Sequence, residues 1–396
     1  MVAVRDRLFT PRFFLMCAFT FTVFLSAFQL FPTAPFHIRD LGGSTFAAGL
    51  FLAFLTYSSA ATAPFTGALA DRLGLRRTLL ISALAISVFS VGYALLRDHR
   101  LMLGLTLLHG LFWSGLLTAS GAYMTSMLPP ARRAEGIGYW GLASVAAIAV
   151  APSLGFWIYR YGWTTLCAVT GLLNLAMAVI AWRLPPERLE PRDEAPRQAG
   201  SLIEWRVMAL AATLMLYSFS YGGITSFAAM YADLCGVTPK PIYLTVLAVG
   251  ILVTRPFTGS LADRIGYTRV LIPCLGLISI GLALLQCGST WIWHVASAAV
   301  FGAGYGSAYP IFAAYVLQRV SDARRGAAFG AIIAAFDTGI GTGSLVTGWI
   351  VEHAGFRPAF AVGAALSALA IPYFFAIRRV LPALPALPAL SPQGPG

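Results

Sequence analysis

The chain has 396 residues, of which 58% are hydrophobic and 11% are charged, and its formal net charge is +12. This composition excludes an ordinary water-soluble domain, which is about half apolar and about a quarter charged. The basic excess does not indicate nucleic-acid binding, because the positive residues lie in short segments between long apolar stretches. The sequence therefore predicts an all-α membrane protein.

Twelve apolar stretches are each long enough to cross about 30 Å of hydrocarbon as a helix. The first six are expected near 13–35, 45–66, 78–96 and 101–127, then one that ends near 159, then 164–182. The second six are expected near 206–229, 241–260, 269–288, 291–318, 327–350 and 358–377. This order predicts an N-terminal six-helix bundle over 1–182, a cytoplasmic linker over 183–205, a C-terminal six-helix bundle over 206–378 and a disordered tail over 379–396.

The Lys and Arg residues are divided unevenly between the two sides of the predicted membrane. If the N-terminus is cytoplasmic, the outer segments hold few of the 27 positive residues, namely Arg39, Arg97, Arg100, Arg160, Lys240 and Arg357. Positive residues concentrate in cytoplasmic loops, so both termini are expected in the cytoplasm. The use of Arg in place of Lys is typical of a GC-rich bacterial genome, which favours a bacterial inner (cytoplasmic) membrane.

A charged segment that contains glycine occurs twice and is expected to form a loop each time. The first copy, 64–79, contains Gly67, Asp71, Arg72, Gly74, Arg76 and Arg77, and the second, 256–271, contains Gly259, Asp263, Arg264, Gly266 and Arg269. Matching positions differ by 259 − 67 = 192, and the same offset relates Gly110 to Gly302. The repeat predicts two six-helix units in parallel tandem, with a site between them.

These residues resemble the major facilitator superfamily, whose members carry a Gly-x-x-x-Asp-Arg-x-Gly-x-Arg-Arg pattern between helices two and three and an echo of it in the second half. The resemblance covers about 13–378 and implies twelve transmembrane helices in two bundles and secondary transport by alternating access. It is closest to bacterial proton-coupled efflux members.

The repeated motif suggests a conformational latch. Its glycines permit tight reversal, and its acidic residues can pair with arginines or cap a helix when the cytoplasmic ends of the halves meet. The latch would consist of Gly67, Asp71, Arg72, Gly74, Arg76, Arg77, Asp263, Arg264 and Arg269. The alternative is that the motif only anchors the topology.

Two charged residues lie inside predicted spans. Asp337 is in the eleventh stretch and Arg255 is in the eighth, and an ionisable group within a membrane is by default functional. Helices eight and eleven are expected to be neighbours, which would allow Arg255 to reach Asp337. Three interpretations stay open: a structural ion pair, a proton-linked switch on Asp337, or Arg255 as a docking point for an anionic substrate.

Other candidates are a histidine and a set of weakly polar or aromatic residues. His109 stands where proton-coupled members often have arginine, and it could accept a proton or simply pack through a hydrogen bond. The expected cavity lining is Gln29, Tyr57, Trp113, Tyr217, Tyr221, Tyr305 and Tyr309, which suits an amphipathic substrate better than a sugar. Plain packing is the alternative for each of these aromatic residues.

The sequence thus favours a secondary transporter that exports a small amphipathic molecule in exchange for protons. The first alternative is a carrier of small organic anions or monocarboxylates that uses Arg255, and the second is a transport-inactive membrane receptor or scaffold. No enzyme motif, metal cluster or cofactor site is visible, so no enzyme activity, cofactor, metal or nucleic-acid partner is expected. The expected partners are a small-molecule substrate, protons and the lipid bilayer, with the protein acting as a monomer.

Overall fold

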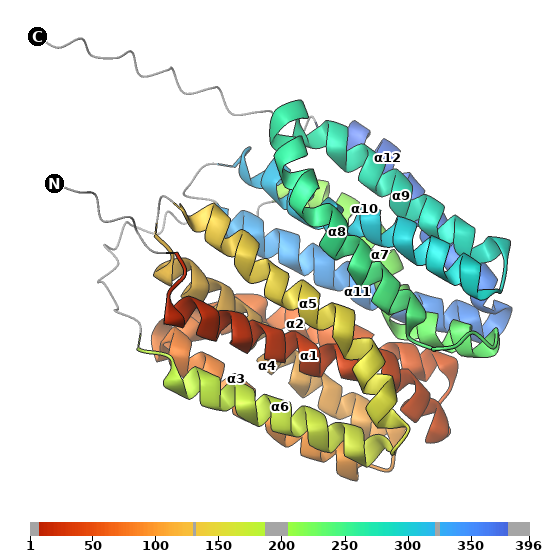
Figure 1. The fold of residues 1–396 in the computed structure, drawn as a ribbon, viewed down its shortest axis with the longest axis horizontal. Helices are drawn as coiled ribbons and strands as arrows, with labels where there is room; N and C mark the ends of the chain where they lie inside the picture. Colours follow the sequence, from red (N-terminus) through yellow and green to blue (C-terminus); the bar gives the residue numbers. More distant parts are fainter. Residues whose placement is uncertain (1–7, 130–131, 187–204, 321–324, 379–396) are drawn as a thin grey trace, which may run out of the picture.

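The computed structural model describes residues 8–129, 132–186, 205–320 and 325–378. These residues form twelve α-helices that run alternately across a single bundle (Figure 1). Their bounds are α1 Pro11–Asp40, α2 Thr45–Leu73, α3 Leu75–Leu95, α4 His99–Met127, α5 Arg133–Tyr159, α6 Trp163–Arg183, α7 Trp205–Leu234, α8 Ile242–Ile265, α9 Tyr267–Cys287, α10 Trp291–Leu317, α11 Arg325–Ala354 and α12 Phe356–Ile377.

Each of the twelve helices is long and apolar enough to cross a membrane, which confirms the predicted fold class. The linker and tail expected from the sequence fall largely outside the described residues. We call the side at which α1 begins and α12 ends the terminal side, and the opposite side the far side.

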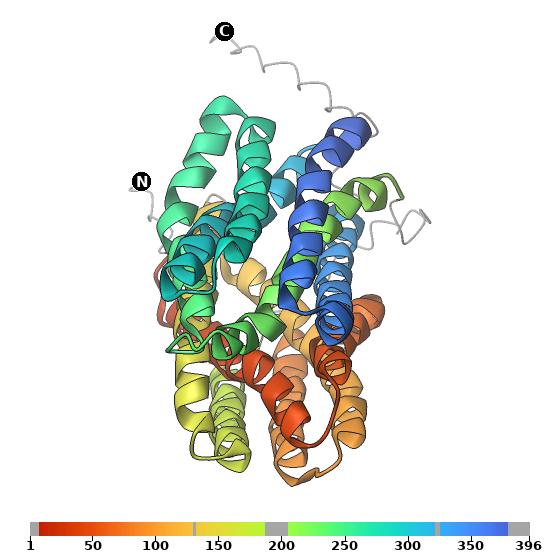
Figure 2. The same cartoon turned by 90° about the vertical axis from the view of Figure 1, so that its right-hand side faces the viewer.

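The same packing pattern occurs in α1–α6 and in α7–α12. In the first set α1 packs on α5, α2 on α4 and α3 on α6, and in the second set α7 packs on α11, α8 on α10 and α9 on α12. Figure 2 shows the two sets one above the other. Contact between them is made chiefly by α2 with α11 and by α5 with α8, and these two pairs are related by the same repeat.

Matching glycines position matching helices in the two sets. A β-carbon on Gly110 of α4 would collide with the carbonyl oxygen of Leu55 on α2, and one on Gly302 of α10 would collide with the carbonyl oxygen of Leu247 on α8. Gly302 lies 192 residues after Gly110, and Leu247 lies 192 residues after Leu55, so the two crossings are equivalent in the repeat. In the absence of a side chain, the two helix backbones can touch at each crossing.

The charged motif is helical and not a loop, so the sequence-based expectation is wrong here. Helix α2 continues to Leu73 and α3 begins at Leu75, with a break at Gly74 alone. Gly74 has φ +91°, and Gly266 makes the equivalent break between α8 and α9 with φ +96°. A helix can extend beyond its apolar part because its own hydrogen bonds satisfy the backbone while charged side chains reach water.

Helix α11 is held between α7 and α2 by glycines that face both neighbours. Added β-carbons on Gly339 and Gly343 would strike the α7 backbone, at Met215 and Phe219 respectively. A β-carbon on Gly348 would lie 2.9 Å from the carbonyl oxygen of Thr45 on α2. Close helix approach of this kind is typical of membrane proteins, where small residues line helix interfaces.

Candidate functional site

Asp337 lies near the middle of α11 and is buried, with 7% of its surface exposed. Its Oδ2 atom accepts a hydrogen bond of 2.8 Å from the hydroxyl of Ser59, which is at the middle of α2 and is itself 2% exposed. The carboxyl group and its hydroxyl partner therefore belong to different six-helix sets. Within the described parts of the chain, Asp337 makes no ion pair.

The Ser59 contact is the innermost of a ladder of hydrogen bonds between α2 and α11. At the far side, the backbone N–H of Phe46 donates to Oε2 of Glu352 over 2.7 Å. Further along, the Ser344 hydroxyl donates to the carbonyl of Gly49 over 2.8 Å, and the hydroxyls of Tyr57 and Thr342 are 2.8 Å apart. The ladder joins the two sets from the far side to the middle of the bundle.

Arg255 does not pair with Asp337 in this structure. Helix α8 packs on α5, α7, α9 and α10, whereas α11 packs on α2, α7, α10 and α12, so α8 and α11 share no packed interface. The expectation that they are neighbours is therefore wrong, because α7 and α10 lie between them. The guanidinium of Arg255 faces α5 instead, where a β-carbon on Gly141 would lie 3.4 Å from its Nη2 atom.

Four tyrosines predicted to line a cavity lie together in the second set. The rings of Tyr221 and Tyr305 stack with centroids 4.3 Å apart, and Tyr217 meets Tyr305 edge-on at 6.2 Å. The buried hydroxyls of Tyr217 and Tyr305 have no hydrogen-bond partner among the described residues. Tyr309 packs against Phe336, the residue before Asp337, with ring centroids 4.9 Å apart.

The other predicted lining residues are dispersed. Tyr57 belongs to the α2–α11 ladder. Gln29 is fully buried on α1, where its side-chain amide donates to the Leu25 carbonyl over 3.0 Å and its Oε1 atom has no partner in the described structure. Trp113 packs edge-on against Phe24 and Phe31 inside the first set.

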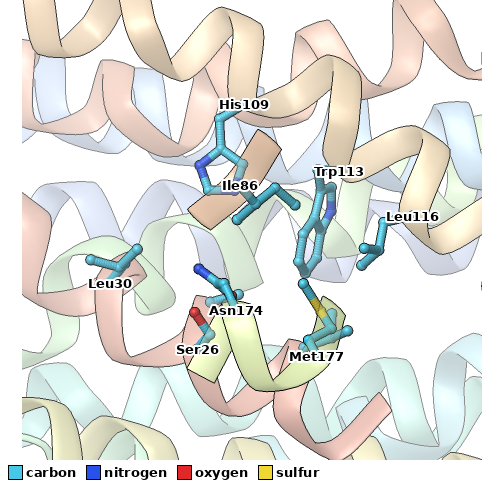
Figure 3. A pocket seen from close by; sticks show the side chains of 10 residues that line it. Ser26, Leu30, Ile86, His109, Trp113, Leu116, Asn174 and Met177 are labelled. Atoms are coloured by element: carbon cyan, nitrogen blue, oxygen red, sulfur yellow. The ribbon is translucent and has the colours of Figure 1, made fainter. Parts of the chain in front are cut away.

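His109 lies in the interior of the first set, away from the contacts between the sets. Its Nδ1 atom is 3.1 Å from the hydroxyl of Tyr93. Its ring faces a void of about 10 Å³ that is also lined by Ser26, Asn174 and Trp113 (Figure 3). A void of this size holds roughly one water molecule, so it is far too small for a substrate.

The latch candidates lie on the terminal side, and most of them are exposed. Arg72, Arg77, Arg264 and Arg269 are exposed, as is Asp263, which accepts a hydrogen bond of 2.6 Å from the Tyr267 hydroxyl. The guanidinium of Arg76 donates to the carbonyl of Trp182 at the end of α6. Helical Gly67 lies 3.7 Å, measured from an added β-carbon, from Thr118 of α4. The side chain of Asp71 lies outside the described structure.

Sequence reasoning missed Ser59, Gly141 and Glu352. Serine and glycine are common in membrane helices, so neither residue type signals a contact between distant segments. Glu352 lies near the end of a predicted span, where an acidic residue is unremarkable. Glu352 and Phe46 are 306 residues apart along the chain, so the sequence gives no sign that they are in contact.

Comparison with known proteins identifies the family. The model of the Major Facilitator Superfamily matches residues 15–253 and 241–394. An uncharacterized MFS-type transporter of Pseudomonas aeruginosa is 27% identical over 367 residues, which cover 89% of this chain and 90% of that protein. Multidrug resistance protein MdtG of Yersinia enterocolitica is 25% identical over 358 residues, 86% of each chain.

A solved structure agrees at the level of fold. The nucleoside transporter NupG matches with a TM-score of 0.78 at 15% identity, over 93% of this chain and 100% of that chain. These matches confirm the family resemblance, and the family consists of transporters and not of enzymes. This chain is a multi-pass membrane transporter and belongs to the Major Facilitator Superfamily.

Proposed function

We propose that the protein is a proton-coupled secondary transporter that exports a small amphipathic compound, and that Asp337 carries the coupling proton. One observation supports this proposal above the others. Asp337 is a buried carboxyl group whose hydrogen bond comes from Ser59, in the opposite six-helix set. Any motion that separates α2 from α11 at this level must change the surroundings of the carboxyl group.

That arrangement links protonation to conformation. A charged carboxylate within the membrane is costly without a partner, and here Ser59 supplies one hydrogen bond to it. Separation of the two sets removes that bond. The charged carboxylate therefore favours the arrangement in which α2 and α11 are in contact more strongly than the neutral carboxyl group does. Two conformations that differ in proton affinity are coupled to the proton gradient by thermodynamic linkage.

The substrate class rests on the aromatic residues near Asp337. Tyr309 is half-buried and exposes part of its ring, and Tyr217, Tyr221 and Tyr305 are buried in the same aromatic group. An aromatic group with few charges suits an amphipathic molecule. The relative named as a multidrug resistance protein favours export of such compounds.

Alternating access would proceed by rocking of an N-terminal six-helix unit against a C-terminal one. The terminal side would face the cytoplasm of a bacterium, as the distribution of arginines favours, and the protein would act as a monomer in the inner membrane. The motif around Gly74 and its echo around Gly266 would then form the cytoplasmic latch.

A second candidate is transport of small organic anions through Arg255. The observation in its favour is that this guanidinium pairs with no carboxylate within the described structure and faces the other six-helix set at Gly141. A cation placed between the two sets without an anion of the protein could bind the carboxylate of a substrate. In this second candidate function Arg255 binds the substrate and does not form the ion pair with Asp337 that the sequence had suggested.

The test begins with a thermal-shift screen of the purified protein against amphipathic drugs and metabolites, because a ligand of the native state raises its apparent stability. A compound found in this way is then offered to proteoliposomes with an acidic lumen. Uptake driven by the pH gradient is expected in the parent protein and is expected to be lost in Asp337→Asn, with binding retained.

Asp98→Asn is the matched control, since Asp98 is an exposed carboxylate that caps α4 on the far side. It should transport as the parent does. Gradient-driven uptake by Asp337→Asn at the rate of the parent would contradict the proposed role of Asp337.

A further inference from the structure

Glu352 makes a contact at the far side that the proposed function does not use. It lies near the far end of α11, and its Oε2 atom accepts the backbone N–H of Phe46 over 2.7 Å. Phe46 is in the first turn of α2, which starts at Thr45. A carboxylate of one six-helix set therefore occupies the N-terminus of a helix in the other set.

The N-terminus of α2 needs such a partner. The first N–H groups of a helix have no acceptor within the helix, and together with the helix dipole they favour a negative charge. Ser44, the N-cap residue, satisfies one of them by accepting from the N–H of Ala47 over 3.1 Å. Glu352 satisfies the N–H of Phe46, so the cap of α2 is shared between the two sets.

We call the far side closed when the far ends of α2 and α11 are in contact, as they are in this structure. The surrounding contacts make this cap depend on the closed far side. Gly348 lies one helical turn before Glu352 on α11. It allows α11 to approach α2 so closely that a β-carbon added to Gly348 would lie 2.9 Å from the carbonyl oxygen of Thr45. When the far ends of α2 and α11 separate, Glu352 can no longer reach Phe46 and the α2 cap is lost.

We propose that Glu352 is the far-side gate residue of this transporter: by capping α2 across the two six-helix sets, it favours the conformation in which the far side is closed. The gate is separate from Asp337, because it acts through a helix N-terminus at the membrane edge and requires no proton. Loss of a helix N-cap acceptor changes a conformational equilibrium about 2- to 30-fold. Removal of Glu352 should shift the ratio of closed to open far side by such a factor.

The experiment measures the separation of the two sets directly. Spin labels are attached at Arg97→Cys and Ser289→Cys, which are exposed positions in the α3–α4 and α9–α10 turns on the far side, in a background without the native cysteines. Distance distributions are recorded by double electron–electron resonance in lipid nanodiscs. Glu352→Ala should gain a longer-distance population relative to the parent, and Glu352→Gln, which keeps an acceptor but no charge, should show a smaller gain.

Asp98→Ala is the matched control. Asp98 also caps a far-side helix, since its Oδ1 atom accepts the N–H of Arg100 over 2.7 Å, but both residues belong to the same six-helix set. Its distance distribution should equal that of the parent. Identical distributions for Glu352→Ala and the parent would overturn the proposal, as would an equal shift in Asp98→Ala. The measurement uses no substrate and no pH gradient, so its result is independent of the role of Asp337.

Discussion

The hydrogen bond between Ser59 and Asp337 leads to a prediction that needs no substrate. Ser59→Ala removes the donor from a carboxyl group that is only 7% exposed. A hydrogen bond to a charged group stabilises by about 1.5–3 kcal/mol, and one between neutral groups by about 0.5–1.5 kcal/mol. The loss in unfolding free energy should therefore be about 1.5–3 kcal/mol in the parent at a pH where Asp337 is charged, and about 0.5–1.5 kcal/mol in Asp337→Asn.

The assay is a double-mutant cycle, with unfolding followed by circular dichroism in mixed micelles of increasing dodecyl sulfate content at pH 8. The four proteins are the parent, the two single variants and the double variant. A coupling energy of about 1 kcal/mol is expected, since residues that share a hydrogen bond are not additive. At low pH the carboxyl group of the parent is neutral, so the coupling should decrease there.

Ser58→Ala provides the control for this cycle. The Ser58 hydroxyl donates over 2.6 Å to the carbonyl of Leu107, which lies in the same six-helix set. Its effect on stability should be the same with aspartate or asparagine at position 337. Equal losses for Ser59→Ala in both backgrounds would show that Ser59 stabilises no charge on Asp337, and the proposed proton switch would fail.

Two further predictions test Arg255 and the helix crossings. If Arg255 docks an anion, Arg255→Ala should weaken binding of a carboxylate ligand at least tenfold in isothermal titration while binding of its uncharged amide is unchanged; equal loss for both ligands would argue for a packing role. Gly110→Ala and Gly302→Ala should each lower the unfolding free energy by about 1–3 kcal/mol through overpacking, whereas Gly104→Ala, whose β-carbon would meet nothing within 4 Å, should be neutral or slightly stabilising. Similar effects at Gly104 and Gly110 would refute the crossing argument.

The number and order of the helices could be predicted from the sequence, because membrane-spanning helices need long apolar stretches and satisfy their own backbone hydrogen bonds. The prediction failed at the repeated motif, where charge was taken as the mark of a loop. Hydropathy reports the transfer of side chains out of water and not the backbone conformation. Asp71 and Arg72 are thus helical although they are charged.

The buried position of Asp337 was predictable, but its partner was not. The sequence favoured Arg255, since opposite charges in a membrane are expected to pair. The arrangement of helices decides otherwise, because α2 packs along α11 and α8 does not. A single serine 278 positions away along the chain gives no signal in one sequence.

The single-residue breaks at Gly74 and Gly266 have a mechanical consequence. Helices α2 and α3 are joined without a flexible segment, and so are α8 and α9. A connection of one residue keeps the joined helix ends together, so a displacement of the terminal end of α2 also moves the first turn of α3. Each six-helix set contains one such connection, on the terminal side. Lengthening either connection with inserted glycines would let one helix end move without the other and uncouple the motion within that set.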